Sequence, residues 1–162
     1  MEDSAFEELV SQNQDKLLRT CYLYLRDRQL AEDAVQETFL KAYRSLQAFR
    51  GDSSQKTWLT RIAINTCRDL YRSEWFRHMD RRVTPEDLPE SGAPFSSREE
   101  SLIVEVMRLP RRLREVTLLY YYHGMDERDI AEALGISRSA VSDRLSRARR
   151  KLKGMIEGRD EA

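Results

Sequence analysis

The chain has 162 residues, which is enough for one ordinary domain or two small ones. Hydrophobic residues make up 40% and charged residues 35%, a balance that suits compact helical cores and is too polar for a membrane protein. The 28 basic and 28 acidic residues cancel, so a nucleic-acid role would depend on how charge is distributed. No run approaches the roughly 18 apolar residues of a spanning helix, and residues 1–8 are acidic, unlike a signal peptide. We therefore expect a soluble, cytoplasmic protein.

Helical spacing dominates the sequence. Apolar residues recur at intervals of three and four, and runs that alternate apolar with polar residues, as strands do, are absent. Three of the four prolines, Pro85, Pro89 and Pro94, fall in the stretch 75–97 with Gly92 and several serines, a composition typical of a linker. The sequence therefore predicts an all-α protein with two small helical domains, 1–74 and 101–156, joined by a flexible linker over 75–100.

The two cysteines, Cys21 and Cys67, each lie within a helical pattern. They form no CxxC pair, and neither of the two histidines stands at ligand spacing from them. Free cysteine is among the most often buried residue types, so we interpret both as small core residues. We expect no metal site, no cofactor, no small-molecule substrate and no catalytic residues.

The clearest helix covers residues 31–46. Its apolar and small residues fall at i, i+3, i+4, i+7, i+8, i+11, i+12 and i+15, which is the spacing of one buried face. These residues are Ala31, Ala34, Val35, Thr38, Phe39, Ala42, Tyr43 and Leu46. We expect this face to pack in the core of the first domain.

A neighbouring face of the same helix displays two carboxylates, an amide and an apolar anchor at i, i+3, i+4 and i+7, from Asp33, Gln36, Glu37 and Leu40. Such a patch can dock on a basic or amide-rich helical partner, although spacing alone favours an ordinary solvated face. Asp33 and Glu37 would also fit an acid and base pair, since carboxylates one turn apart tune each other's pKa. The sequence supplies no nucleophile, metal ligands or phosphate loop to complete such an active site.

Residues 56–72 form a second amphipathic pattern after a turn at 51–54. Its core stripe is Leu59, Ile62, Ala63, Thr66 and Leu70. Its other side carries Trp58, Arg61, Asn65, Arg68 and Arg72 at steps of three and four. A ring that stacks a base contributes about 1–3 kcal/mol, arginines bind phosphates and an amide reads a base edge, so this face suits a nucleic-acid single strand. The alternative is a tryptophan that anchors the core beside solubilising arginines.

Residues 125–153 predict a helix-turn-helix. The segment 125–134 forms a short helix, Gly135 supplies the turn and Ser137 caps the helix that follows. The core stripe of that second helix steps by four, three and four through Val141, Leu145, Ala148 and Leu152. The remaining positions of the helix face elsewhere and are mostly hydrogen-bond donors.

The second helix of this motif is basic. Between residues 137 and 153 seven basic residues accompany one acid, Asp143, so a neutral chain carries a local charge of about +6. A recognition helix places its N-terminal residues on base edges in the major groove. The candidates for contact with bases or phosphates are Arg138, Ser139, Ser142, Asp143, Arg144, Ser146 and Arg147. Basic amphipathic helices also bind acidic proteins or membranes, but the turn and the capping serine favour DNA.

Three stretches of the chain resemble one family. DAVQETFLKAYR (33–44), running into 49–51, is similar to the polymerase-binding region two point two of extracytoplasmic-function sigma factors, the bacterial subunits that bring RNA polymerase to promoters. KTWLTRIAIN (56–65) resembles their regions two point three and two point four, which melt and read the minus-ten element. Residues 109–119, 129–137 and 140–152 are similar to region four, which reads the minus-thirty-five element. The resemblance spans 6–153 in the family's order.

This resemblance implies roles for individual residues. The clamp helices of the largest polymerase subunit would be gripped by Asp33, Gln36, Glu37 and Leu40. A base flipped from the non-template strand would enter a pocket formed by Asn65 and the loop 51–55. Flipping a base out of its stack costs about 2–4 kcal/mol. The backbone of that strand would be followed by Lys56, Arg61 and Arg68. Many relatives have an aromatic residue where this chain has Thr60, which argues against a DNA contact at that position.

The resemblance also implies partners. They are core RNA polymerase, through its clamp helices and flap, promoter DNA, and an anti-sigma factor. Such an anti-sigma factor is often membrane-bound and would hold the protein inactive at the inner membrane face until a stress signal arrives. The linker would pass near the active-site and RNA-exit channels of the polymerase. The expected function is that of an alternative sigma factor, not an enzyme.

Two other classes of protein stay open at this point. The first is a helix-turn-helix regulator with a helical N-terminal sensing domain; against it, the sequence has no alternating βα pattern with a phosphorylatable aspartate. The second is an anti-sigma factor or another helical adaptor that binds only protein. Such an adaptor would have no use for both the 58–72 face and the arginine-rich last helix.

Overall fold

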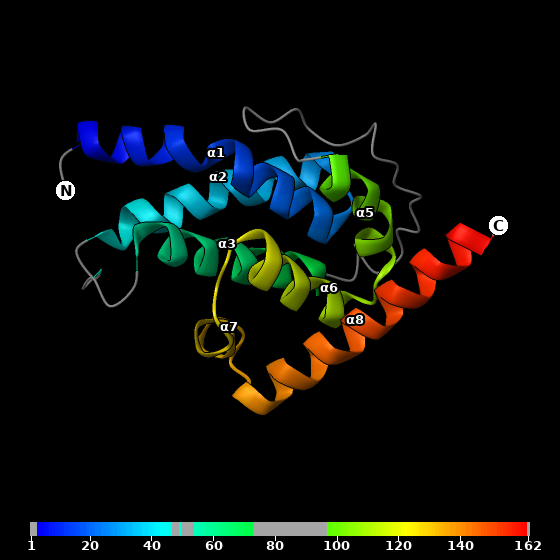
Figure 1. Cartoon of the computed structure of the whole chain (residues 1–162). Coiled ribbons are helices and arrows are strands. Elements are labelled where there is room, and N and C mark those ends of the chain that lie inside the picture. Colours follow the sequence, from blue (N-terminus) through cyan, green and yellow to red (C-terminus); the bar gives the residue numbers. More distant parts are fainter. Residues whose placement is uncertain (1–2, 47–48, 50–53, 73–96, 162) are drawn as a thin grey trace. The chain divides into compact units, whose positions relative to one another are not determined.

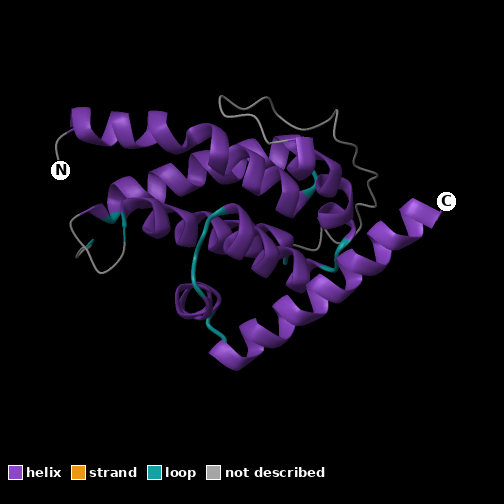
Figure 2. Cartoon of the chain, viewed as in Figure 1, coloured by secondary structure: helices purple, strands orange, loops and turns teal. Residues whose placement is uncertain are grey.

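The structure is a computed structural model that describes residues 3–46, 49, 54–72 and 97–161. Within these ranges every regular element is a helix and no strand occurs, so the predicted all-α class is confirmed (Figure 2). The described residues fall into two compact units, 3–72 and 97–161, as expected for two helical domains. None of the helices in these ranges is both long and apolar enough to cross a membrane.

The first unit consists of three helices, α1 (Asp3–Leu25), α2 (Arg28–Arg44) and α3 (Gln55–Tyr71) (Figure 1). Arg26 ends α1 in a left-handed conformation (φ 61°), and the carboxylate of Asp27 then accepts a hydrogen bond from the backbone N–H of Leu30 to cap α2. This two-residue connection folds α2 back along α1. The hydroxyl of Ser54 caps α3 by accepting from the N–H of Thr57 at 3.0 Å.

The core of the first unit lies where these three helices pack on one another. Its fully buried members include both cysteines, as predicted, and they carry no disulfide. Along α2 the buried positions are mostly small, Ala31, Ala34 and Ala42, which lets neighbouring helices approach closely. Four buried threonines on these helices each donate their hydroxyl to the backbone carbonyl four residues earlier, so each hydroxyl has an acceptor within its own helix. They are Thr20, Thr38, Thr60 and Thr66.

Two parts of the predicted core pattern need correction. The face of α2 is buried only through Ala42: Phe39 and Leu46 are half-buried, and the side chain of Tyr43 is 53% exposed. Tyr43 lies at the end of α2 opposite the start of α1, where its ring meets the edge of Phe6 at 5.2 Å instead of entering the core. On α3 the predicted positions Leu59, Ala63 and Thr66 are buried, whereas Ile62 and Leu70 are only half-buried. The buried face is displaced from the predicted stripe, because it also takes in Thr60, Ile64 and Cys67.

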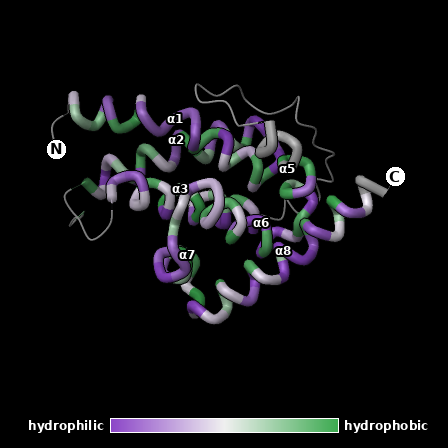
Figure 3. Tube along the Cα trace, in the orientation of Figure 1, coloured by the Kyte–Doolittle hydropathy of each residue, from purple (hydrophilic) through white to green (hydrophobic). Residues whose placement is uncertain are grey.

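The second unit contains α5 (Ser97–Arg108), α6 (Arg111–Thr117), a π-helical turn η3 (Leu118–Tyr122), α7 (Glu127–Leu134) and α8 (Arg138–Glu161). The end of the predicted linker, 97–100, is therefore helical, while 73–96 lies outside the described residues. Most of α8 is polar along its trace, with apolar residues at intervals (Figure 3). Pro110 separates α5 from α6, as a residue without a backbone N–H does at a helix start.

The core of the second unit forms between α6, α7 and α8. Val141, Leu145 and Ala148 are buried as predicted, and Leu152 packs half-buried against a cluster formed by Leu109, Leu113 and Ala148. A buried leucine contributes about 1.5–3 kcal/mol relative to an exposed one, so this stripe is what fixes α8 on the unit.

A buried arginine joins α5 to α6. Arg114 is 2% exposed, and Nη1 of its guanidinium donates to the carbonyls of Met107 at 3.3 Å and Leu109 at 3.1 Å. These carbonyls lie at the end of α5, where no following turn of helix supplies backbone N–H donors. The arginine side chain supplies the donors in their place. The sequence did not predict this role, because Arg114 is one of several arginines between residues 111 and 114 and nothing in the spacing distinguishes it.

Candidate nucleic-acid and protein interfaces

The helix-turn-helix has the geometry that its sequence predicts. Gly135 ends α7 at φ 67° and ψ 36°, a left-handed conformation that glycine adopts without steric cost. The N–H of Ile136 then bonds the carbonyl of Ala131 at 3.1 Å, and the hydroxyl of Ser137 accepts from the N–H of Ala140 at 3.1 Å to cap α8. The first helix begins two residues later than predicted, at Glu127, because the carboxylate of Asp126 caps it by accepting from the N–H of Asp129.

The exposed face of α8 brings together most of the predicted DNA contacts. Its exposed members are Arg138, Ser139, Ser142, Asp143, Ser146 and Arg147, followed by Arg150. They lie on the side of the helix away from the buried stripe, since Val141, Leu145 and Ala148 face the core. The arrangement offers guanidiniums and hydroxyls to a polyanionic partner from one rigid element.

Arg144 lies apart from this face. Its side chain is only 20% exposed, and its Nη1 stands 3.9 Å from Oε1 of Glu115, a carboxylate that is 1% exposed. The other oxygen of Glu115 lies 3.6 Å from Nη1 of Arg111. Position 144 precedes Leu145 and flanks the core stripe, which turns its side chain toward α6. A buried carboxylate needs compensating charge, and Arg144 supplies part of it from α8.

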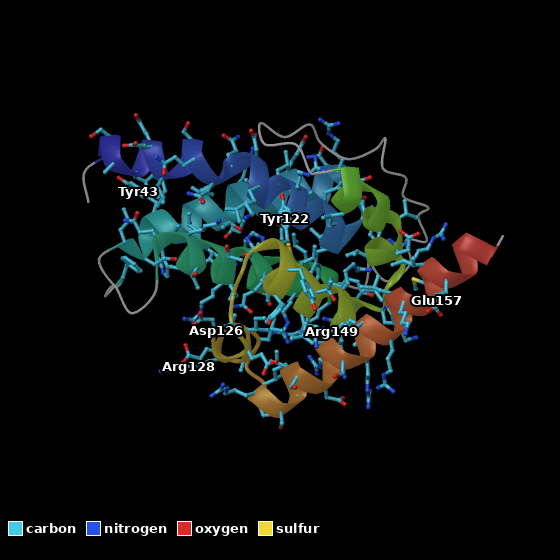
Figure 4. All side chains as sticks on the ribbon, in the orientation of Figure 1. Tyr43, Tyr122, Asp126, Arg128, Arg149 and Glu157 are labelled. Carbon is cyan, nitrogen blue, oxygen red and sulfur yellow. The ribbon has the colours of Figure 1, made fainter. Side chains whose placement is uncertain are left out.

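Arg149 is held by two tyrosines of the π-helical turn. Its Nε donates to the hydroxyl of Tyr121 at 2.6 Å, and its guanidinium lies 5.8 Å and 5.7 Å from the ring centres of Tyr120 and Tyr121. Figure 4 shows the position of Arg149 on α8. The hydrogen bond with Tyr121 raises the pKa of Arg149. The side chain of Tyr121 is 57% exposed, so this contact lies at the surface. Sequence reasoning missed it, although three consecutive tyrosines were the available signal.

The outward face of α3 is less exposed than the face of α8. Lys56, Asn65 and Arg72 are exposed, whereas Trp58, Arg61 and Arg68 are half-buried. The ring of Trp58 lies 4.9 Å from that of Phe49, so the tryptophan also anchors the start of α3. The predicted base pocket is described only from Ser54 onward; its other loop residues, 51–53, lie outside the described residues.

Thr60 belongs to the core and not to the exposed face of α3. Its side chain is 2% exposed, and its hydroxyl donates to the carbonyl of Lys56 at 2.8 Å. A threonine in this place satisfies its own hydroxyl within the helix. The departure from the family's aromatic residue is thus accommodated inside the first unit.

The acidic and amide face of α2 is accessible. Asp33 and Gln36 are exposed, Glu37 is half-buried, and the side chain of Leu40 is 50% exposed. Nε2 of Gln29 donates to Oδ1 of Asp33 at 3.1 Å, which extends the polar surface toward the start of the helix. The described part of the chain holds no group of histidine, cysteine, aspartate and glutamate suited to a metal ion.

The two units match two family models in the order that the sequence predicts. The model described as Sigma-70 region 2 matches residues 9–77, and the model described as Sigma-70, region 4, matches residues 99–152. The first match contains α2 and α3 with their exposed faces, and the second contains the helix-turn-helix.

Similar proteins agree with these matches. The RNA polymerase sigma-H factor of Pseudomonas aeruginosa is 35% identical over 90% of this chain and 82% of its own length, and the ECF RNA polymerase sigma-E factor of Haemophilus influenzae is 32% identical over 94% and 88%. Among solved structures, CnrH in complex with the cytosolic domain of CnrY aligns with a TM-score of 0.70 at 27% identity, covering 97% of this chain and 90% of CnrH. The chain therefore belongs to the extracytoplasmic-function sigma factors, which direct RNA polymerase to promoters.

Proposed function

We propose that the exposed face of α2 is where this sigma factor binds core RNA polymerase. The face offers two carboxylates, an amide and a leucine that is half exposed, from Asp33, Gln36, Glu37 and Leu40. An apolar anchor rimmed by acidic groups suits the basic or amide-rich surface expected of the clamp helices in the largest polymerase subunit. In this proposal the domain 1–74 contributes both core binding and minus-ten recognition.

The face of α3 is proposed to melt and read the minus-ten element. Asn65 is exposed in the middle of the face and has donor and acceptor atoms for the pairing edge of a flipped base. Lys56, Arg61, Arg68 and Arg72 lie before and after it along the helix and would follow the strand's phosphates. Trp58 would contribute its ring, although its packing on Phe49 leaves less of the ring for stacking than an exposed tryptophan offers.

The domain 101–156 is proposed to read the minus-thirty-five element with α8. The six exposed members of the predicted set would meet the major groove, while Arg144 would act from the flank, where it pairs with Glu115. The linker 75–100 would pass between the two promoter-binding domains near the polymerase channels, and the second domain would also contact the flap. Catalysis would stay with the polymerase, so we expect no catalytic residue or cofactor in this chain.

We further propose that an anti-sigma factor controls this protein. CnrH, at 27% identity, was solved with the cytosolic domain of CnrY bound to it. A partner of this kind would cover the surfaces that bind polymerase. The sigma factor itself would work in the cytoplasm, where promoter DNA and polymerase are, and would be held at the inner membrane face if its partner is membrane-bound.

The observation that carries the promoter assignment is the capped helix-turn-helix followed by an exposed, mostly basic face, in the same chain as the Asn65 face. The decisive experiment combines the purified protein, bacterial core RNA polymerase and a DNA fragment from upstream of its own gene. We expect a specific run-off transcript that depends on the protein. Failure to bind core polymerase would favour a helix-turn-helix regulator; core binding without a transcript would mean that the fragment lacks the promoter.

A further inference from the structure

The arginines near the middle of α8 have unequal partners. Arg144 is engaged by the buried Glu115, and Arg149 is engaged by Tyr121. Arg147 points from the exposed face, and its ionic partner in the described part of the chain is Asp143 of the same helix. Arg144 and Arg149 therefore fix α8 on its unit, while the guanidinium of Arg147 is presented to the outside.

The pair between Asp143 and Arg147 has a specific geometry. Oδ2 of Asp143 lies 3.1 Å from Nε of Arg147, so the carboxylate occupies the inner edge of the guanidinium. The two terminal nitrogens then remain available as a parallel pair of donors. Guanine presents two acceptors, O6 and N7, to the major groove, and a bidentate arginine is the group that matches them.

A carboxylate at position 143 would weaken the binding of α8 to DNA unless it had another role. It is the one acid between residues 137 and 153, on a surface that meets phosphates, where a negative charge lowers attraction for DNA. Both side chains are more than half exposed, at 55% for Asp143 and 62% for Arg147, and exposed pairs of this spacing add little to helix stability. Ordering a long arginine before it meets a base, in contrast, lowers the entropy cost of binding.

We propose that Asp143 is a positioning residue that determines specificity: it holds Arg147 in the orientation that reads a guanine in the upstream promoter element. The inference rests on the proposed function of α8. It also makes the reading depend on the pair, because an arginine without its carboxylate would move between the base and the nearby phosphates.

The test uses polymerase holoenzyme and a DNA library randomised in the upstream element. Wild type should select guanine at one position by about 10-fold or more over other bases. Asp143→Ala and Asp143→Asn should lower that preference severalfold while affinity for unrelated DNA stays equal or rises, because a negative charge is removed. Arg147→Lys, which keeps the charge but has no fork of donors, should lose the same preference.

The matched control is Glu157→Gln, which removes the acid of another ion pair on α8, Lys153 to Glu157 at 3.9 Å, beyond the proposed reading face. It should leave the selected sequence unchanged. Thermal unfolding of each variant checks that α8 is intact, as expected for exposed positions.

The outcomes separate the two levels of the proposal. A wild-type holoenzyme that selects no upstream sequence would contradict the proposed function itself. Selection by wild type with an identical preference in Asp143→Ala would overturn the positioning role alone. Loss of a cytosine preference with the guanine preference intact would also overturn it, because Asp143 would then read a base directly.

Discussion

The exposed faces of α3 and α8 both gather arginines, but they are built differently. On α8 the proposed reading residues stand free of the core, and arginines at the flanks hold the helix in place through Glu115 and Tyr121. On α3 an exposed amide, Asn65, lies between arginines that are themselves half-buried. A duplex offers its base edges at fixed places along a groove, which an exposed rigid helix can meet. A flipped base needs surroundings with depth, which half-buried side chains provide.

The largest effect should come from removing the support of α8. Leu145→Ala deletes a side chain that is 0% exposed, and we expect the free energy of unfolding of the second unit to fall by about 2–5 kcal/mol. Urea denaturation followed by far-UV circular dichroism measures this loss. Leu40→Ala, at a leucine that is 50% exposed, is the matched control and should shift the transition little. Similar losses in both variants would contradict the burial pattern.

A second prediction separates promoter opening from polymerase binding. Asn65→Ala should reduce formation of the open promoter complex by about tenfold, the effect of losing one amide contact to a base edge. Its affinity for core polymerase should be unchanged, because Asn65 lies on α3 and not on the face of α2. Permanganate reactivity of the minus-ten bases measures opening, and gel filtration with core polymerase measures binding. Equal loss of both activities would overturn the assignment of Asn65.

A third prediction concerns the charge of α8. Arg147→Ala should weaken binding to the upstream element, while the slope of log affinity against log salt concentration should stay nearly unchanged, because the proposed contact of Arg147 is to a base and its charge is paired with Asp143. Fluorescence anisotropy at several salt concentrations gives this slope. A slope lowered by about 1 would mean that Arg147 contacts a phosphate and would contradict the base contact. No change in affinity or slope would remove it from the interface.

The smallest expected effect is at the surface contact of Arg149. Tyr121→Phe removes the hydroxyl that accepts from Nε of Arg149 and keeps the ring beneath the guanidinium. We expect the second unit to lose about 0.5 kcal/mol of stability, near the lower limit for a hydrogen bond, because water can replace the hydroxyl. Differential scanning calorimetry can resolve a shift of this size. A loss as large as that of Leu145→Ala would mean that the hydroxyl of Tyr121 contributes far more than one exposed hydrogen bond.

Patterns with a strong physical period were predictable from the sequence. The core stripe of α8, the capping roles of Gly135 and Ser137 and the burial of both cysteines follow from spacing and residue type, and all three are confirmed. Contacts between distant elements were not predictable. The pairing of Arg144 with Glu115 depends on how α6 packs on α8, and from sequence alone Arg144 was indistinguishable from the exposed arginines around it.

Burial at helix ends was also beyond the sequence. Tyr43 continues the apolar spacing of α2, but it lies at the end of the helix, where fewer neighbouring residues cover it. Its ring contacts Phe6 at the start of α1 and stays exposed. The roles of single residues toward polymerase and promoter stay predictions, because spacing and exposure identify a surface but not its partner.

The π-helical turn Leu118–Tyr122 has a consequence for how the reading helix is aimed. Here the N–H of His123 bonds the carbonyl of Leu118, five residues back, so the turn contains one residue more than an α-helical turn. One residue corresponds to roughly 100° of rotation about a helix axis. Deleting a single tyrosine would therefore rotate the direction in which the chain leaves this turn before Met125. The helix-turn-helix that follows would then face another direction.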